Sequence, residues 1–126
     1  MNFKENKAIY LQIAERICDM ILLGEYKEEE RVPSVREYAT IVEVNFNTVM
    51  RSFDHLQSSE IIFNRRGIGY FVAEGAGEKI RSMRKESFLQ GEINDFFKQI
   101  YMLEISMQEI VEMYNNFSKQ QEKQAI

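Results

Sequence analysis

The sequence predicts a mainly α-helical fold with one small β-hairpin. Apolar residues recur at helical spacing in several segments, and helix-start signals precede three of them. One other segment, rich in β-branched and aromatic residues, is interrupted by glycine, which is typical of a hairpin. A chain of 126 residues has room for one compact domain and an appendage. We expect the domain at 1–75 and a short helical region at 76–126.

The composition, 44% hydrophobic and 29% charged, is that of an ordinary folded protein, and only the tail SKQQEKQAI is expected to be disordered. A formal net charge of -4 argues against a surface that attracts polyanions everywhere, but allows a local basic patch. Cys18 and His55 are the only cysteine and histidine, which excludes an internal disulfide and argues against a zinc site. The polar N-terminus and the lack of a long apolar run predict a cytoplasmic protein with no membrane partner.

The first helix is expected from about Lys7 to Leu23. Its apolar residues follow one another in steps of three and four, which places them on one stripe of an amphipathic helix. Gly24 stands where a helix can close in a left-handed cap. The residues of the stripe are Tyr10, Ile13, Ile17 and Ile21.

A short second helix is expected from about Ser34 to Val42. Ser34 and Glu37 fit the S-x-x-E capping box, in which each side chain bonds the other residue's backbone amide. The cap is an ordinary structural feature, whatever else Ser34 does.

A third helix is expected to begin after the N-cap Asn45, with Val44 and Val49 as a hydrophobic staple. Val49, Phe53 and Leu56 mark the inward stripe. At about 100° per residue, the opposite face holds polar and charged side chains. That outer face comprises Asn47, Met50, Arg51 and Asp54.

The segment IIFNRRGIGYFVA is typical of a β-hairpin whose loop lies at Arg66 to Gly69. Two isolated strands are marginal in water, and the segment Glu30 to Val32 offers a short third strand.

Two further helices are expected in GEINDFFKQIYML and SMQEIVEMYNNF, joined by a tight connection at about Leu103 to Ser106. Ser106 and Glu109 form a second capping box. Two isolated helices cannot hide this much apolar surface, whereas a twofold-symmetric partner can, so we interpret the stripe as a dimer core; the alternative is an effector pocket. The expected dimer residues are Ile93, Phe96, Phe97, Ile100, Ile110, Val111, Tyr114 and Phe117.

This order of elements is a helix-turn-helix followed by a wing, an arrangement that can bind double-stranded DNA. A helix fits the major groove, where amide and guanidinium groups can read base edges. A hairpin tipped with arginine can reach phosphates or the minor groove, and its glycines allow close backbone approach.

Residues 9–72 resemble the winged-helix domain of the GntR family of bacterial transcription regulators. The resemblance lies in the IYxQI opening, the PSxRExA helix, the NTVxR recognition helix and the RRGxGxFV wing. The remaining residues resemble the YtrA subfamily, whose C-terminal part is a small helical dimerisation unit. Two departures are Glu29, where the family commonly has glycine, and Asn45-Phe46, where it commonly has Ser-Arg.

The resemblance implies a homodimeric regulator, usually a repressor, that binds an inverted repeat in double-stranded DNA. A small-molecule effector is a further possible partner, whose identity the sequence does not reveal, and neither the operator nor the regulated genes can be named. The positions expected to contact DNA are Ser34, Arg36, Asn45, Asn47, Thr48, Arg51, Arg65, Arg66, Gly67 and Gly69.

Phe46 has two interpretations. As an aromatic residue at a helix start, it can pack against the wing or the second helix, which we slightly favour. It can instead contact a thymine methyl group, a known mode of base readout.

The alternative function is a winged-helix protein-interaction module that does not bind DNA. The loss of the arginine at Phe46 and the acidic balance of residues 1–73, net -2 from nine Lys/Arg and eleven Asp/Glu, favour it. The sequence shows no activated nucleophile, paired-carboxylate cleft, phosphate-binding glycine loop or metal-ligand spacing, so no enzyme, cofactor or metal is expected.

Overall fold

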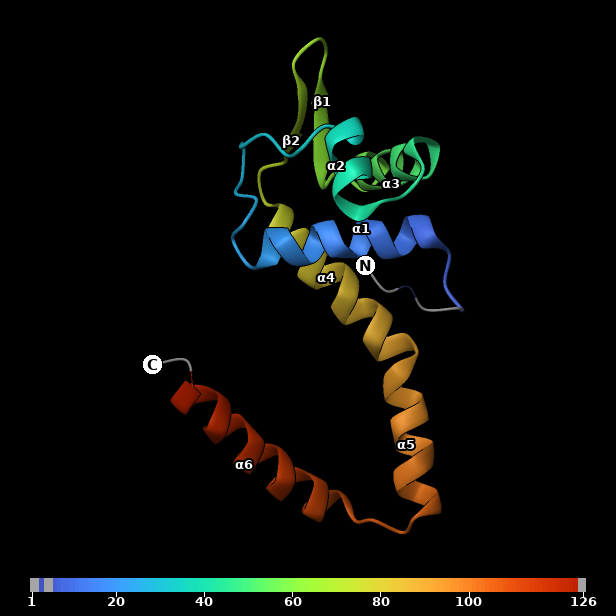
Figure 1. Cartoon of the computed structure of the whole chain (residues 1–126). Coiled ribbons are helices and arrows are strands. Elements are labelled where there is room, and N and C mark those ends of the chain that lie inside the picture. Colours follow the sequence, from blue (N-terminus) through green and yellow to red (C-terminus); the bar gives the residue numbers. More distant parts are fainter. Residues whose placement is uncertain (1–2, 4–5, 125–126) are drawn as a thin grey trace. The chain divides into compact units, whose positions relative to one another are not determined.

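The computed structural model describes residue 3 and residues 6–124. These form two compact units, residues 1–84 and 85–126. The elements, shown in Figure 1, are α1 (Ile9–Leu22), α2 (Val35–Val42), α3 (Phe46–Ser58), β1 (Ile62–Arg65), β2 (Gly69–Val72), α4 (Ala76–Gln90), α5 (Glu92–Met102) and α6 (Met107–Gln124). The mainly α-helical class with one hairpin is confirmed.

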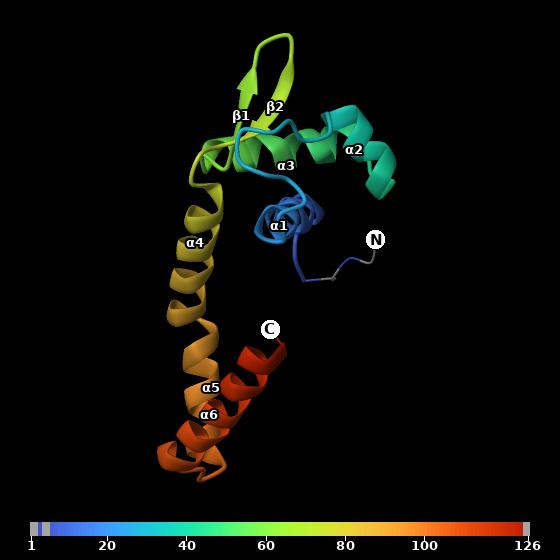
Figure 2. The same cartoon turned by 90° about the vertical axis from the view of Figure 1, so that its left-hand side faces the viewer.

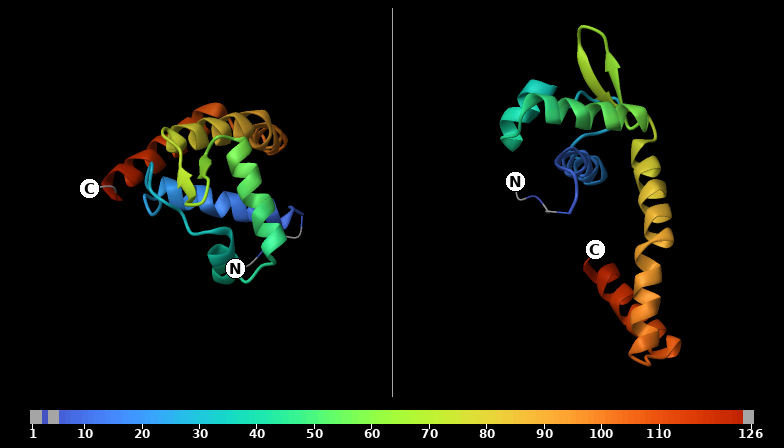
Figure 3. Two further views of the ribbon diagram at one scale, coloured as in Figure 1. Left: turned by 90° about the horizontal axis from the view of Figure 1, so that it is seen from above. Right: turned by 90° about the vertical axis from the view of Figure 1, so that its right-hand side faces the viewer.

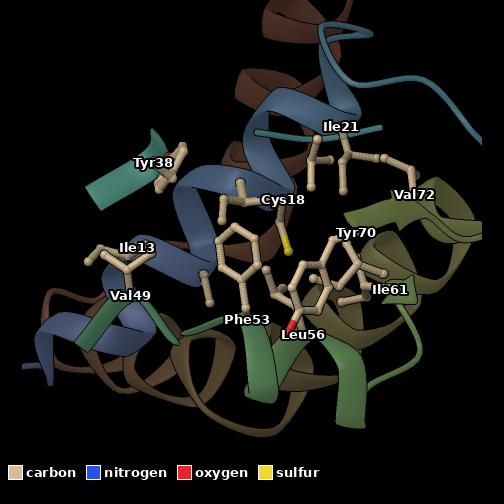
Figure 4. Packing of buried hydrophobic residues seen from close by; sticks show 14 of the residues in the cluster. Ile13, Cys18, Ile21, Tyr38, Val49, Phe53, Leu56, Ile61, Tyr70 and Val72 are labelled. Atoms are coloured by element: carbon tan, nitrogen blue, oxygen red, sulfur yellow. The ribbon is translucent and has the colours of Figure 1, made fainter. Parts of the chain in front are cut away.

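The hydrophobic core of the first unit lies between α1, α3 and the sheet. Phe53 of α3 is completely buried at its centre, with its ring centroid 5.0 Å from that of Tyr70 on β2 and 6.2 Å from that of Tyr38 on α2. Figure 4 shows Phe53, Cys18 and Tyr70 close together. Burial raises the pKa of the Cys18 thiol to about 11, and Cys18 packs as a small apolar residue.

The helix starts and ends follow the expected local chemistry. Gly24 has φ 82° just after α1, and the capping box of Ser34 and Glu37 starts α2. Asn45 caps α3 by accepting a hydrogen bond from the backbone N–H of Asn47 at 2.8 Å. These signals are short-range, which is why they could be recognised before the structure was known.

The hairpin pairs β1 with β2 in antiparallel register, from Ile62 opposite Val72 to Arg65 opposite Gly69. A bridge from Arg31 to Phe71 adds a third piece of chain at the expected place, although it is too short to be a strand. Figures 2 and 3 show the hairpin projecting beyond α3 on the side away from α1.

Helix α4 was not among the expected elements. Its first residues belong to the first unit, because Ala76 and Ile80 are buried in that core. Arg84 then ties α4 to α1: it forms an ion pair with Asp19 at 2.8 Å and donates a hydrogen bond to the carbonyl of Glu15 at 3.2 Å. This compact unit therefore extends past residue 75, to Arg84.

In the second unit, α5 and α6 are joined at 103–106, as expected, and diverge from this connection in Figure 1. The Ser106 hydroxyl accepts a hydrogen bond from the backbone N–H of Glu109 at 3.1 Å. The expectation of a disordered tail is wrong for residues 118–124, which continue α6; the last two residues lie outside the described part. No helix among the described residues is both long and apolar enough to cross a bilayer.

Four glutamates adopt the left-handed backbone conformation that normally favours glycine. They are Glu29, Glu43, Glu60 and Glu104, with φ between 55° and 64°. Glu29 stands where glycine is common in the sequences that this chain resembles: its φ is 64°, and its N–H donates to the carbonyl of Val72 at 2.8 Å. Each such residue stores a small amount of backbone strain.

Replacing Glu29 by glycine is expected to increase the free energy of unfolding by about 1 kcal/mol, because it relieves this strain. Glu30→Gly is the matched control, since it removes the same charge at a residue without positive φ. The control should lower the free energy of unfolding by about 0.5 to 1 kcal/mol. Thermal unfolding of both variants measures the effect, and changes of equal sign would contradict the assignment to strain.

Candidate nucleic-acid interface

The start of α2 presents Ser34 and Arg36, two of the expected DNA contacts. Ser34 is half-buried, and its hydroxyl oxygen accepts the N–H of Glu37 at 3.0 Å while the Glu37 carboxylate accepts the N–H of Ser34 at 3.3 Å. Hydrogen bonds from the Ser34 side chain and backbone lower the pKa of Glu37, and Arg31 lowers it further. Arg36 is exposed beside this cap. A fixed helix start with a cation in its first turn suits phosphate binding.

The outer face of α3 is open to solvent at most of the expected positions. Asn45, Asn47 and Arg51 are exposed, and Thr48 is half-buried. Met50, which was expected on this face, is also half-buried and packs against the core. The outer face of α3 that can contact DNA is therefore narrower than the expected set of residues indicated.

Phe46 is 45% exposed at the first position of α3, and it is not among the residues that pack on the core. Phe46 is therefore not buried in the core, and burial was the reason for favouring its packing against the wing or the second helix. Asn45 takes the capping role, so Phe46 has no structural task in the cap. An exposed aromatic ring at the start of a recognition helix is free to contact a base.

Arg51 bends from the outer face of α3 toward α1. Its Cζ atom lies 4.0 Å from the ring centroid of Tyr10, close enough for a cation–π interaction. His55, one turn further along α3, meets the same ring edge-on at 6.1 Å. The guanidinium therefore lies on the α1 flank of the helix.

The wing carries Arg65 and Arg66, both exposed, at the end of β1 and in the loop. Gly67 has φ 78° in this loop, a conformation that a side chain would disfavour, and the N–H of Ile68 donates to the carbonyl of Arg65 at 2.9 Å. Ile68 is 59% exposed at the tip. Two cations and an apolar tip can thus reach a surface beside α3.

Arg31 belongs to the same region and was missed in the sequence. A Cβ atom at Gly69 would lie 2.8 Å from Nε of Arg31, so the Arg31 side chain lies close against the backbone at the loop end of β2. Arg31 also lies 3.8 Å from the Glu37 carboxylate. Backbone hydrogen bonds around the bridge between Arg31 and Phe71 hold these segments together, as the expected third strand at Glu30 to Val32 implied, but the sequence did not single out the Arg31 side chain.

The second unit offers an apolar surface of the kind expected for self-association. Of the eight expected dimer residues, only Ile100 is buried, at 8% exposure; Ile93 and Ile110 are half-buried, and the others are exposed. The exposed large apolar residues of the unit are Phe88, Leu89, Phe96, Phe97, Tyr101, Met102, Leu103, Met107, Val111, Met113, Tyr114 and Phe117. This exceeds what a soluble monomer normally leaves in water.

No described residues form a cluster of three or more His, Cys, Asp or Glu side chains that could hold a metal ion. The features of the first unit instead match a known family. The model of the bacterial regulatory proteins of the gntR family matches residues 9–72, which contain α1, the helix-turn-helix and the wing. The chain belongs to the GntR family.

Similar proteins agree with this assignment. The GntR-family chain is 33% identical to the HTH-type transcriptional regulator YhcF of Bacillus subtilis, over 93% of its own length and 95% of that protein. It is 37% identical to the transcriptional repressor YtrA of the same organism, over 58% of its own length and 56% of YtrA.

Solved structures extend the likeness to most of the chain. A GntR-family transcriptional regulator from Bacteroides thetaiotaomicron is 60% identical, with a TM-score of 0.80 over 90% of this chain and 99% of that one. The GntR-family transcription factor YtrA from Sulfolobus acidocaldarius is 26% identical, with a TM-score of 0.54 over 95% of this chain and 96% of that one. This GntR-family protein is a DNA-binding transcriptional regulator and not an enzyme.

Proposed function

We propose that this GntR-family protein is a cytoplasmic repressor that binds an inverted-repeat operator as a homodimer. The similarity to the repressor YtrA supports the repressor role. The observation that carries the binding mode is the placement of arginines on two sides of α3: Arg51 on the α1 flank, and Arg65 and Arg66 on the wing. By occupying its operator, such a dimer would block access of the polymerase.

In this mode, α3 enters the major groove. The groove is about 12 Å wide and a helix with its side chains has a diameter of about 10 to 12 Å, so the flanks of α3 face the two phosphate backbones. Arg51 then contacts one backbone, and Arg65 and Arg66 contact the other or the adjacent minor groove. The exposed Asn47 and Phe46 face the base edges.

The other expected residues have supporting positions in this proposal. Ser34 and Arg36 clamp phosphates at the start of α2, and Asn45 and Thr48 hold the start of α3 at the groove. Gly67 and Gly69 let the wing backbone approach the sugar-phosphate surface, and Gly69 also leaves room for Arg31. Arg31 is an additional contact that the structure suggests.

Dimerisation through 85–126 gives the operator its symmetry. A twofold axis relates the DNA-binding domains of the two subunits, so the bound DNA must contain an inverted repeat. Helix-turn-helix dimers place their half-sites about 34 Å apart, or a multiple of this distance. The exposed residues Phe96, Phe97, Val111, Tyr114 and Phe117 are proposed to form this interface, with Ile93 and Ile110 at its edge and Ile100 supporting it from inside.

Selection of bound sequences from a random pool of duplex DNA tests the proposal. The expected result is one palindrome with two equal half-sites, enriched in thymine where Phe46 meets a base. Enrichment of an asymmetric sequence would contradict the homodimeric mode. Failure to enrich any sequence would contradict specific DNA binding and favour the protein-interaction alternative.

Arg51→Ala is expected to weaken binding to the selected duplex by about 1 to 3 kcal/mol and to reduce the slope of log affinity against log salt by about 1. Both effects follow from losing one guanidinium contact to the DNA. A fluorescence-anisotropy titration at several salt concentrations measures them.

The control is Arg81→Ala, which removes an exposed arginine from α4 in the same unit. It should leave affinity within about twofold of the wild-type value, since it lies outside the proposed interface. Equal losses in the two variants would show that total charge, and not the position of Arg51, determines binding.

A further inference from the structure

The two arginines best placed for DNA share a feature that the binding proposal does not require. Arg51 lies with Cζ 4.0 Å from the ring centroid of Tyr10, and Arg65 lies with Cζ 4.8 Å from that of Phe71. Neither forms an ion pair with any residue that the structure describes. Both are therefore held by an aromatic face.

Cations elsewhere in the first unit are held differently. In this acidic chain, four other cations of the described part pair with carboxylates: one beside α1, two on α4 and one at the start of α2. These ion pairs are Lys7–Glu15, Arg31–Glu37, Lys79–Glu60 and Arg84–Asp19. Carboxylate partners are thus common, and the aromatic partners of Arg51 and Arg65 stand apart from them.

The Tyr10 ring under Arg51 is tied to α3 by two contacts. The carbonyl of Tyr10 accepts a hydrogen bond from the hydroxyl of Ser52 at 2.7 Å, and Ser52 is completely buried between α1 and α3. The His55 ring meets the Tyr10 ring at an interplanar angle of 79°. The hydrogen bond holds the backbone of Tyr10 against α3, and the His55 ring supports the orientation of the Tyr10 ring that Arg51 covers.

The platform under Arg65 is built across the hairpin. Phe63 and Phe71 are opposite each other in the strand register, and their rings stack at 5.8 Å with an interplanar angle of 21°. Arg65 lies over both rings, 5.5 Å from the centroid of Phe63. The aromatic pair occupies the solvent side of the wing, because the alternate residues Ile62, Tyr70 and Val72 are buried.

A guanidinium that stacks on a ring face keeps its positive charge and its free N–H donors, and DNA binding needs both. Its donors lie in its own plane and point outward, so stacking orients the group and leaves the N–H groups free for phosphate oxygens or base edges. A carboxylate partner would occupy the same donors and cancel the charge. Ordering the side chain before binding also lowers the entropy cost of the contact.

We propose that Tyr10 and Phe71 are positioning residues for DNA binding, which orient Arg51 and Arg65 through their ring faces while keeping the guanidinium donors free. This inference rests on the proposed binding mode. Helix α1 then takes part in DNA recognition through Tyr10, whose spacing in the sequence indicated only a place in the apolar stripe of that helix.

The test compares Tyr10→Leu with Tyr10→Phe on the palindromic duplex selected by the wild-type protein. Tyr10→Leu, which lacks a ring face, is expected to weaken binding about three- to fivefold, and Tyr10→Phe, which keeps it, should stay near the wild-type affinity. The salt slope of Tyr10→Leu should equal that of the wild type, because the charge of Arg51 is retained.

A double-mutant cycle with Arg51→Ala separates positioning from a general structural role. If Tyr10 acts through Arg51, Tyr10→Leu has no further effect once Arg51 is alanine. Equal losses in both backgrounds would overturn the proposal, as would unchanged affinity of Tyr10→Leu in the wild-type background.

The wing provides an independent arm, which decides the matter if Tyr10→Leu does not unfold cooperatively. Phe71→Leu should weaken binding and Phe71→Tyr should not, and the loss should vanish in the Arg65→Ala background. If Phe71→Leu binds as the wild type does, the proposal fails. Failure of the wild-type protein to select any duplex would instead overturn the proposed function itself.

Discussion

Replacing Phe97 by glutamate is expected to separate the proposed dimer into monomers and to weaken binding to the proposed palindromic operator about 100-fold. Phe97 is 46% exposed on α5 within the apolar surface. Burying an unpaired carboxylate in an interface costs several kcal/mol, and each 1.4 kcal/mol is a factor of about ten in the dimerisation constant. A monomer then binds one half-site and lacks the binding free energy that the second half-site contributes to a dimer.

Light scattering gives the oligomeric state, and a gel-shift titration gives the affinity. Gln99→Glu is the matched control, since it adds the same charge to the exposed side of α5 outside the apolar stripe. The control should remain dimeric and bind as the wild type does. A Phe97→Glu variant that stays dimeric would show that a different surface holds the two subunits together.

Phe53→Ala is expected to lower the free energy of unfolding by about 3 to 5 kcal/mol. Phe53 is completely buried and contacts the rings of Tyr38 and Tyr70, so one truncation loosens α2, α3 and the hairpin together. This loss is a large part of the roughly 5 to 15 kcal/mol that stabilises a typical domain. Chemical denaturation followed by circular dichroism measures it.

Phe53→Leu is the control for volume, because it fills much of the cavity. It should cost clearly less than the alanine variant and retain DNA binding at low temperature. Similar losses in both variants would indicate that the aromatic contacts, and not the filled volume, dominate the contribution of Phe53.

The elements with short-range signals could be predicted from the sequence. The capping box at Ser34, the cap at Asn45 and the stripe that includes Val49 and Phe53 each act within about one or two helical turns, and the structure has the helices that they predict. The glycine loop with flanking β-branched residues likewise predicted the hairpin. Local rules were sufficient here because tertiary packing agreed with them.

Helix α4 was not predicted from the sequence because few of its side chains are buried. Only Ala76 and Ile80 are buried in it, so its sequence lacks the continuous apolar stripe that periodicity detects. The end of α6 was missed for a related reason: its Lys, Gln and Glu residues were interpreted as a disordered composition, although all three favour helix.

The candidate site was less accessible to prediction because its geometry depends on distant segments. Arg51 on α3 and Tyr10 on α1 have the whole of α2 between them in the sequence, and Arg31 approaches Gly69 because its segment pairs with β2. Phe46 illustrates the opposite error. Its neighbours in sequence suggested packing, but the core is filled without it.

Glu43, the left-handed residue between α2 and α3, has its carboxylate exposed beside the proposed reading helix. On the proposed binding mode, this negative group opposes the phosphates of any duplex, whatever its bases, while the arginines compensate only where they fit well. Arbitrary chromosomal sequence is then held briefly, and the regulator spends its time at the few places that match it. On this binding mode, a slightly unfavourable charge beside α3 thus shortens the residence of the protein on DNA that does not match.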